Sequence, residues 1–289
     1  MLESFVFISG FLFGNQVLKK GIMSTKDIIR KKGKRLLVPS IIFSILYYIC
    51  FCNIKERGIA VYDIYDIISG FAHMWFLPML FWCFIISNIV IKLNILSIKS
   101  IIILSIVFSI LSIAPLPFQL SNSFHFLPFF LVGMFWGMGR IQSYKISKLQ
   151  FLLVVILFLV SFVMLTLLNN YINSIRDDYP TYIKIIFSCL TNLNRLVYSG
   201  IGVLLVYHFM IAAKERGIKT NGFWIMLSEC CFGVYLFQQF YLIYLYDYTS
   251  IAVVINYYWL PWICFLIALL LSLGSTLLIR QTSLGRKIL

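Results

Sequence analysis

Two histidines each open a long apolar segment and are the first candidates for chemistry in this chain. His73 lies in AHMWFLP and His125 in FHFLPFF, and both fall at the same predicted depth in a membrane. An imidazole with its ordinary pKa near ~6.5 is largely neutral at pH 7, so it can orient or deprotonate a hydroxyl group. Each histidine can equally be an interfacial residue bonded to a carbonyl, and the sequence leaves both interpretations open.

One arginine lies well inside an apolar segment. Arg195, in LTNLNRLVYSG, is flanked by Asn192 and Asn194. An arginine at the centre of a membrane helix costs about 2.5 to 3.5 kcal/mol on insertion scales, so its side chain is expected to face protein or a water-filled cavity. There it can bind a carbonyl, pyrophosphate or sugar oxygen, or form a structural ion pair. Glu229 is the predicted counter-charge, proton acceptor or interfacial cap, whereas Glu3, at an outer helix end, is expected to be uninformative.

A dense group of cations follows the first apolar segment. Residues 19–36 hold eight Lys and Arg side chains, among them Arg30, Lys31, Lys34 and Arg35. Arginine binds phosphate through two parallel hydrogen bonds, so the group suits a phosphate-bearing ligand. A short basic loop can also act only as a topology anchor on anionic lipid.

The elements that must position these side chains are predicted to be membrane helices. Basic residues concentrate in alternate gaps between apolar runs, which places those gaps in the cytoplasm, the amino terminus outside and the carboxyl terminus inside. The sequence therefore predicts an all-α polytopic bundle in the plasma (inner) membrane, as a single domain over residues 1–289. Nine runs are close to the roughly 20 residues that cross a bilayer: 2–18, 37–53, 72–91, 98–115, 123–140, 149–169, 185–211, 223–247 and 257–279.

Composition excludes several classes of protein. Hydrophobic residues make up 61% of the chain and charged residues 12%, which is incompatible with a soluble fold. The net charge of +14 is placed at the ends of apolar runs, where it suits anionic headgroups rather than nucleic acid. The seven cysteines lack metal-type spacing and are predicted to pack as small apolar residues. No phosphate-binding loop, HExxH or GxSxG motif occurs, so neither a metal site nor a serine nucleophile is predicted.

Five segments, in order along the chain, carry a resemblance to a known family. They are FISGFLF at 7–13, RLLVP at 35–39, HMWFLPMLF at 73–81, FLPFFLVGMFWG at 126–137 and CFGVYLFQQF at 231–240. In this order the chain resembles the membrane acyltransferase-3 family. The resemblance implies transfer of an acyl group, usually acetyl, from cytoplasmic acyl-CoA to a hydroxyl of a cell-envelope or exopolysaccharide sugar. It also implies a histidine base that activates the hydroxyl, with Arg or Lys side chains that hold CoA.

Two features depart from the family's pattern. The family's first helix, which carries a basic residue and the histidine held to be catalytic, is absent, so the ten helices of the family become nine and the chain is expected to be N-terminally incomplete. Ser9, Gly10 and Gly14 form a small-residue face whose partner helix is expected upstream of Met1. Many relatives also have a histidine after the YLF phrase, where this chain has Gln238.

An acyltransferase of groups other than aminoacyl is the predicted activity, and two alternatives stay open. A transporter or flippase of lipid-linked saccharide also accommodates an arginine inside the membrane, but it does not need a cytoplasmic cationic loop. An inactive fragment of the acyltransferase would insert stably without any response to acyl-CoA. The expected partners are membrane lipid and a carbohydrate acceptor, lipid-linked acceptors included, and the oligomeric state is open.

Overall fold

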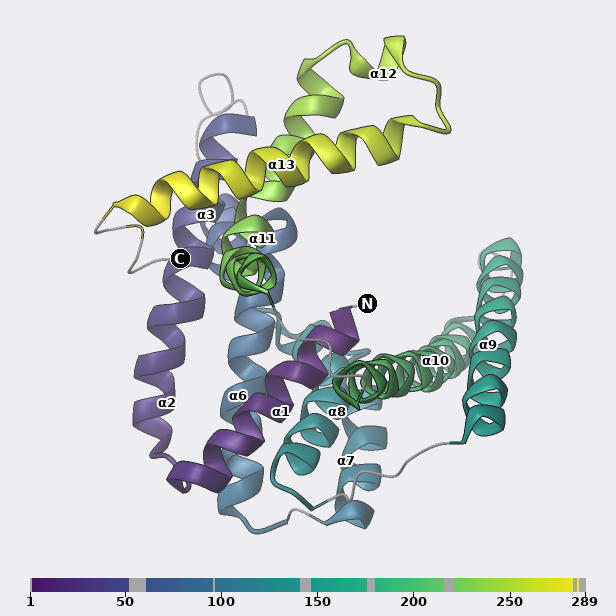
Figure 1. The fold of residues 1–289 in the computed structure, drawn as a ribbon. Coiled ribbons are helices and arrows are strands. Elements are labelled where there is room, and N and C mark those ends of the chain that lie inside the picture. Colours follow the sequence, from purple (N-terminus) through teal and green to yellow (C-terminus); the bar gives the residue numbers. More distant parts are fainter. Residues whose placement is uncertain are drawn as a thin grey trace. The chain divides into compact units, whose positions relative to one another are not determined.

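The computed structural model describes residues 2–51, 61–95, 97–140, 147–175, 180–215, 221–282 and 285 (Figure 1). These residues form helices joined by turns, and none of them is in a strand. Apolar segments of this length favour helices because a helix bonds all its backbone groups internally, which hydrocarbon requires. The predicted all-α class is therefore confirmed.

Each of the nine predicted apolar runs coincides with a long helix. By length and composition alone, four helical stretches of the described residues suit a membrane crossing, namely Thr25–Phe51, Ala72–Lys92, Leu149–Leu168 and Leu260–Gln281. The count of nine crossings stays a prediction. The helices over the nine runs are α1 Leu2–Lys20, α3 Val38–Phe51, α6 Phe76–Lys92, α7 Ile98–Leu111, α8 Leu120–Gly137, α9 Lys148–Ile175, α10 Thr181–Glu215, α11 Gly222–Tyr248 and α13 Leu260–Gln281.

The chain divides into two compact units, which are described separately. The first unit comprises residues up to Leu36 together with Leu77–Ile218. In it, α1 packs along α8, α7 packs against α8, and α10 contacts α1, α7 and α9. It also contains α2 (Thr25–Lys32) and most of η1 (Gly33–Leu37), a π-helical turn that continues α2. Its core is aromatic, with Phe84 packed edge-on against the rings of Phe13 and Phe130.

Four glycines bring α1 and α8 into backbone contact. Gly10 and Gly14 on α1 face α8, and Gly133 and Gly137 on α8 face α1. A methyl group at any of the four would overlap a backbone carbonyl oxygen of the facing helix. Two Gly-x-x-x-Gly patterns thus meet, an arrangement that lets membrane helices approach closely enough for Cα–H groups to contact carbonyls.

This contact corrects the expectation that the partner of the small-residue face lies upstream of Met1. The partner of Gly10 and Gly14 is α8, within the described chain. The contacts also advance together, since Gly10 meets Phe130 and Gly14 meets Met134, so the two helices are parallel. The alternating basic gaps predict the same direction for these two runs, and the helix pair agrees with that prediction.

The second unit comprises Leu37–Phe76 and Lys219–Leu289. Here α3 contacts α5 (Val61–Ser69) and η2 (Ala72–Trp75), and α11 packs antiparallel to α13 near α12 (Ile251–Val254). Thr276 of α13 lies where a side chain at Gly233 of α11 would be, so these helices also approach closely. A buried cluster of Leu245, Leu260, Cys264 and Ala268 joins their other ends.

Adding one methyl group at the glycine contact tests how much the contact contributes to the stability of the protein. We expect Gly10→Ala and Gly133→Ala each to cost about 1–3 kcal/mol, because the facing backbone must move apart, and to lower the Tm in detergent by about 3 to 10 °C. Gly200→Ala on α10 is the matched control, since an added methyl group there meets no atom of the described residues within 4 Å. A Gly10→Ala protein as stable as the Gly200→Ala protein would contradict the close contact.

Candidate functional site

Four polar side chains from three helices converge in the first unit, and we name them the α1–α8–α10 cluster. They are Glu3 of α1, His125 of α8, and Arg195 and Ser199 of α10. The Glu3 side chain is only 10% exposed, its Oε1 lies 4.0 Å from Nε of Arg195, and the Ser199 hydroxyl donates to its carboxylate. The charges of Glu3 and Arg195 both act on the His125 imidazole. A carboxylate, a guanidinium and an imidazole therefore share one small region.

The glycine contact between α1 and α8 sets the position of Glu3 relative to His125 along the helix axes. Phe7 of α1 lies against Gly133 of α8, and the two helices are parallel. Counted back to Glu3, the contact of Phe7 with Gly133 gives residue 129 and the contact of Gly10 with Phe130 gives residue 123, so Glu3 lies level with the stretch that includes His125. The His125 Nε2 is buried and has no hydrogen-bond partner among the described residues. An imidazole nitrogen beside a carboxylate and without a partner is chemically suited to accept a proton.

The cluster revises two expectations from the sequence. Glu3, expected to be uninformative, is buried and is the centre of the polar contacts. Pairing of Arg195 with Glu229 was one of the alternatives that the sequence left open, but the carboxylate near Arg195 is that of Glu3. Its side chain is 51% exposed, so its guanidinium remains accessible to a ligand.

His73, in the second unit, lies among aromatic rings. Its Nε2 is 2.9 Å from the backbone oxygen of Tyr235, and the Tyr235 hydroxyl donates back to the His73 carbonyl at 2.5 Å. The rings of Tyr47 and Tyr235 each meet the imidazole edge-on, with centroids 5.1 Å away. A carbonyl oxygen only accepts, so Nε2 carries the proton and Nδ1 keeps its lone pair. Nδ1 is buried without a partner among the described residues.

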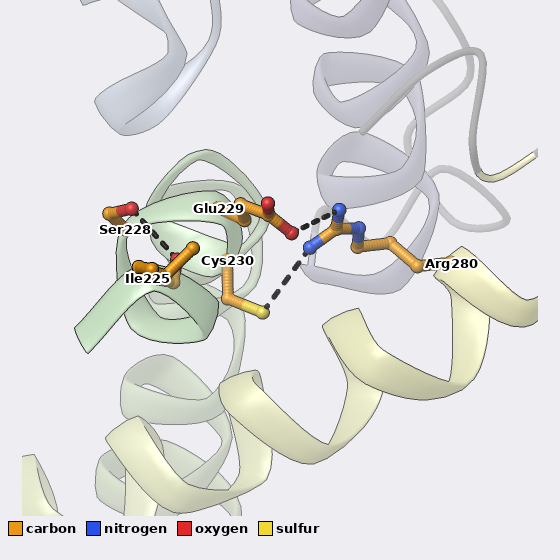
Figure 2. A network of polar contacts seen from close by, with 5 residues as sticks. All are labelled: Ile225, Ser228, Glu229, Cys230 and Arg280. Carbon is orange, nitrogen blue, oxygen red and sulfur yellow. Dashed lines mark hydrogen bonds and ion pairs between the residues drawn. The ribbon is translucent and has the colours of Figure 1, made fainter. Parts of the chain in front are cut away.

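Glu229 has a partner on the neighbouring helix of the second unit. Figure 2 shows Glu229 and Cys230 of α11 pointing toward Arg280 of α13. The Arg280 Nη2 donates to Glu229 Oε2 at 2.9 Å, and Nη1 lies 3.7 Å from the Cys230 sulfur. This ion pair joins the two helices at one end. It favours the structural interpretation of Glu229 over pairing with Arg195.

The predicted cationic loop contains a helix with two distinct faces. Ile28, Lys32 and Leu36 follow one another at intervals of four residues along α2 and η1 and form the inward face, with Ile28 fully buried. The Lys32 ammonium lies 3.8 Å from the Phe84 ring centroid, and this cation–π contact keeps Lys32 on the inward face of the helix. At the start of α2, Thr25 Oγ1 accepts hydrogen bonds from two α6 side chains, Asn88 and Lys92.

The opposite face of this helix carries the exposed cations. Lys26, Arg30 and Lys34 repeat at the same interval of four, with Lys31 and Arg35 beside them, and all five are exposed. We name these five residues the α2 cationic face. Eight residues of helix extend about 12 Å, so the face presents a row of charges over that length. All four residues predicted to bind phosphate, Arg30, Lys31, Lys34 and Arg35, belong to it.

Packing contacts of the first unit relate the α2 cationic face to the cluster. Lys32 lies over Phe84, and the Phe84 ring meets the Phe13 ring of α1 with centroids 5.3 Å apart. Along α1, Phe13 is separated from Glu3 by ten residues, or about 15 Å. The middle of the cationic helix is therefore about 15 Å from the cluster along the α1 axis.

Two members of the cluster were missed by sequence reasoning. Ser199 follows Arg195 by four residues, so both lie on one face of a helix, which was a usable signal. For Glu3 the sequence offered one signal, a predicted depth in the membrane equal to that of His125. The structure assigns His125 and Arg195 to the first unit and His73 and Glu229 to the second, so the four predicted catalytic residues form no single constellation within one unit. In the described ranges, no three His, Cys, Asp or Glu side chains are placed to hold a metal ion.

Comparison with known proteins supports the resemblance seen in the sequence. The model of the acyltransferase-3 family, described as an acyltransferase domain, matches residues 3–281. The matched range includes every residue of the cluster, the α2 cationic face, His73 and Glu229. Searches of curated proteins and of solved structures find no match.

Charge reversal tests the partner of Glu229. Glu229→Arg places two like charges together and is expected to lower the Tm measurably, although the shift should be small, about 1 to 3 °C, because both side chains are partly exposed. Adding Arg280→Glu should restore the Tm to within about 1 °C of the parent protein. A double variant no more stable than Glu229→Arg would mean that Glu229 has a different partner.

Proposed function

Because the chain belongs to the acyltransferase-3 family, we propose that it transfers an acyl group, acetyl in the first instance, from acyl-CoA to a hydroxyl group of a cell-envelope or exopolysaccharide sugar. Among the structural features, the α2 cationic face carries this proposal furthest. It is a helix fixed by a buried side and by hydrogen bonds to α6, and it presents a row of exposed cations. A cationic segment that only sets membrane topology does not need to be held as a helix with its cations on one exposed face.

The donor fits the chemistry of that face. Coenzyme A carries a pyrophosphate and a 3′-phosphate, and guanidinium groups bind phosphate through paired hydrogen bonds. Arg30 and Lys34 are one turn apart on the exposed face, with Lys31 and Arg35 flanking them. In this proposal the phosphates lie along the α2 cationic face, and the pantetheine arm carries the thioester into the first unit.

The transfer itself requires a base and an oxyanion partner. The proposed base is a histidine, for which His73 and His125 are the candidates, and it removes the proton of the sugar hydroxyl as the oxygen attacks the thioester carbonyl carbon. Arg195 is the proposed donor to the developing oxyanion. Glu229, held by Arg280, has a structural role in this proposal. The charge pattern predicts that the two apolar runs containing these histidines begin on the outer side of the membrane, where an envelope sugar arrives.

The activity is tested with the purified chain in lipid nanodiscs. Radiolabelled acetyl-CoA is supplied with a pool of neutral glucose- and N-acetylglucosamine-containing oligosaccharides, and label is measured in acetate and in the sugars. We expect protein-dependent loss of acetyl-CoA, slow to water and faster with an accepted sugar. A chain that neither binds nor consumes acetyl-CoA would contradict the proposal and favour a saccharide transporter or an inactive fragment.

The phosphate role of the α2 cationic face has its own test. The double variant Arg30→Gln/Lys34→Gln should raise the KM for acetyl-CoA about 10- to 100-fold and leave kcat within about threefold. A hydrogen bond to a charged group contributes roughly 1.5–3 kcal/mol, and each substitution removes a part of that contribution. S-acetylpantetheine, which lacks the nucleotide phosphates, should show no change in KM. Lys99→Gln, an exposed lysine of α7, is the control. Equal effects on both donors would contradict phosphate binding at this face.

A further inference from the structure

The surroundings of the two candidate histidines differ in charge. His73 interacts with a backbone carbonyl and with tyrosine rings, and no charged side chain in the described part of the chain acts on it. A histidine that becomes an imidazolium in such a place gains no partner for its charge. Proton transfer to His73 would also leave a cation buried among aromatic side chains.

His125 has the complementary environment. The buried Glu3 carboxylate acts on its ring, and a positive imidazole beside this carboxylate would be stabilised. The Arg195 guanidinium acts on the ring in the opposite sense and more strongly than the carboxylate does, but it is half exposed and can turn toward a ligand. Once its charge is taken up by the acyl oxyanion, the Glu3 carboxylate is left to stabilise the imidazolium. The Ser199 hydroxyl also donates to the carboxylate. Nε2 of His125 is left without a protein partner among the described residues.

We propose that the α1–α8–α10 cluster is the site at which the hydroxyl acceptor is activated, with His125 as the base, Glu3 as its positioning carboxylate and Arg195 as the ligand of the acyl oxygen. The inference rests on the proposed acyl transfer and selects one of its two candidate bases. Its substrate class is a neutral alcohol, such as a sugar hydroxyl, which donates its proton to the free Nε2.

The step balances without any further reactant. The hydroxyl proton moves to His125 Nε2 while the hydroxyl oxygen forms a bond to the thioester carbonyl carbon. The tetrahedral oxyanion lies against the Arg195 guanidinium. Its collapse breaks the carbon–sulfur bond, and the departing CoA sulfur takes the proton from His125. The products are an ester and free CoA, and the imidazole is neutral again.

The distance between the donor and acceptor sites suits this assignment. The α2 cationic face and the cluster both belong to the first unit, and about 15 Å of α1 separates Phe13, level with Lys32, from Glu3. An extended pantetheine arm can cover a distance of this order. The α2 cationic face lies on the opposite side of α2 from Lys32, so the pantetheine arm must also pass this helix to bring the thioester to His125, while the acceptor approaches from the other end of the helices.

The test compares histidine variants of the full chain in nanodiscs with acetyl-CoA and the same oligosaccharide pool. His125→Ala is expected to lower kcat by about 10²- to 10⁴-fold, with the KM for acetyl-CoA within about threefold. Added imidazole should restore the rate of His125→Ala at least tenfold, because a free base can occupy the vacated position. His125→Gln, closer in shape, guards against a folding defect, and its Tm is measured beside the parent's.

The matched variants separate positioning from structure. Glu3→Gln should lower kcat about tenfold and leave the KM for acetyl-CoA unchanged. His73→Ala and His208→Ala are expected to gain no more from imidazole than the parent protein does. An active parent whose folded His125→Ala and His125→Gln variants keep kcat within threefold would overturn the inference and leave the proposed function standing. A parent that consumes no acetyl-CoA would overturn both.

Discussion

Close packing of α1 against α8 through four glycines is the contact on which the first unit depends. Each glycine faces a backbone carbonyl of the other helix, so neither helix can rotate or slide without opening the contact. Interhelical packing of this kind replaces the hydrophobic effect, which gives little association between helices already surrounded by lipid. Because the two helices are parallel, the contact brings their first turns together. Glu3 and His125 are neighbours for that reason.

Charged side chains have two roles in the chain, and the burial of each side chain indicates which role it has. Exposed cations of the α2 cationic face stay on the side of the helix that faces away from Ile28 and Leu36, where they can meet phosphates. The charges of Glu3 and Arg195 belong to the bundle, where an uncompensated carboxylate or guanidinium would be costly. Glu229 and Arg280 satisfy each other between α11 and α13. Burial and pairing together thus select which charged residues remain available to a ligand.

Much of the fold was predictable because apolar runs and basic gaps report membrane helices directly. All nine runs are helical, and the small-residue face of Gly10 and Gly14 was recognised as a packing surface. The identity of its partner was not predictable, since a small-residue face does not specify which helix covers it, and α8 was found there instead of a helix upstream. The pairing of Arg195 with Glu3 was missed because the two residues are far apart in sequence, and their proximity depends on how α10 crosses α1. The helical form of the cationic segment was also missed, because its buried stripe includes a lysine.

The central claim is that Glu3 and His125 act as one unit on the acceptor, and a double-mutant cycle on kcat tests it most directly. The rates of Glu3→Gln, His125→Gln and the double variant are compared with the parent, using acetyl-CoA and an accepted sugar. Residues that act through one another give non-additive losses. The account predicts that Glu3→Gln costs about tenfold in the parent and less than twofold once His125 is replaced. Two independent losses that multiply in the double variant would contradict it.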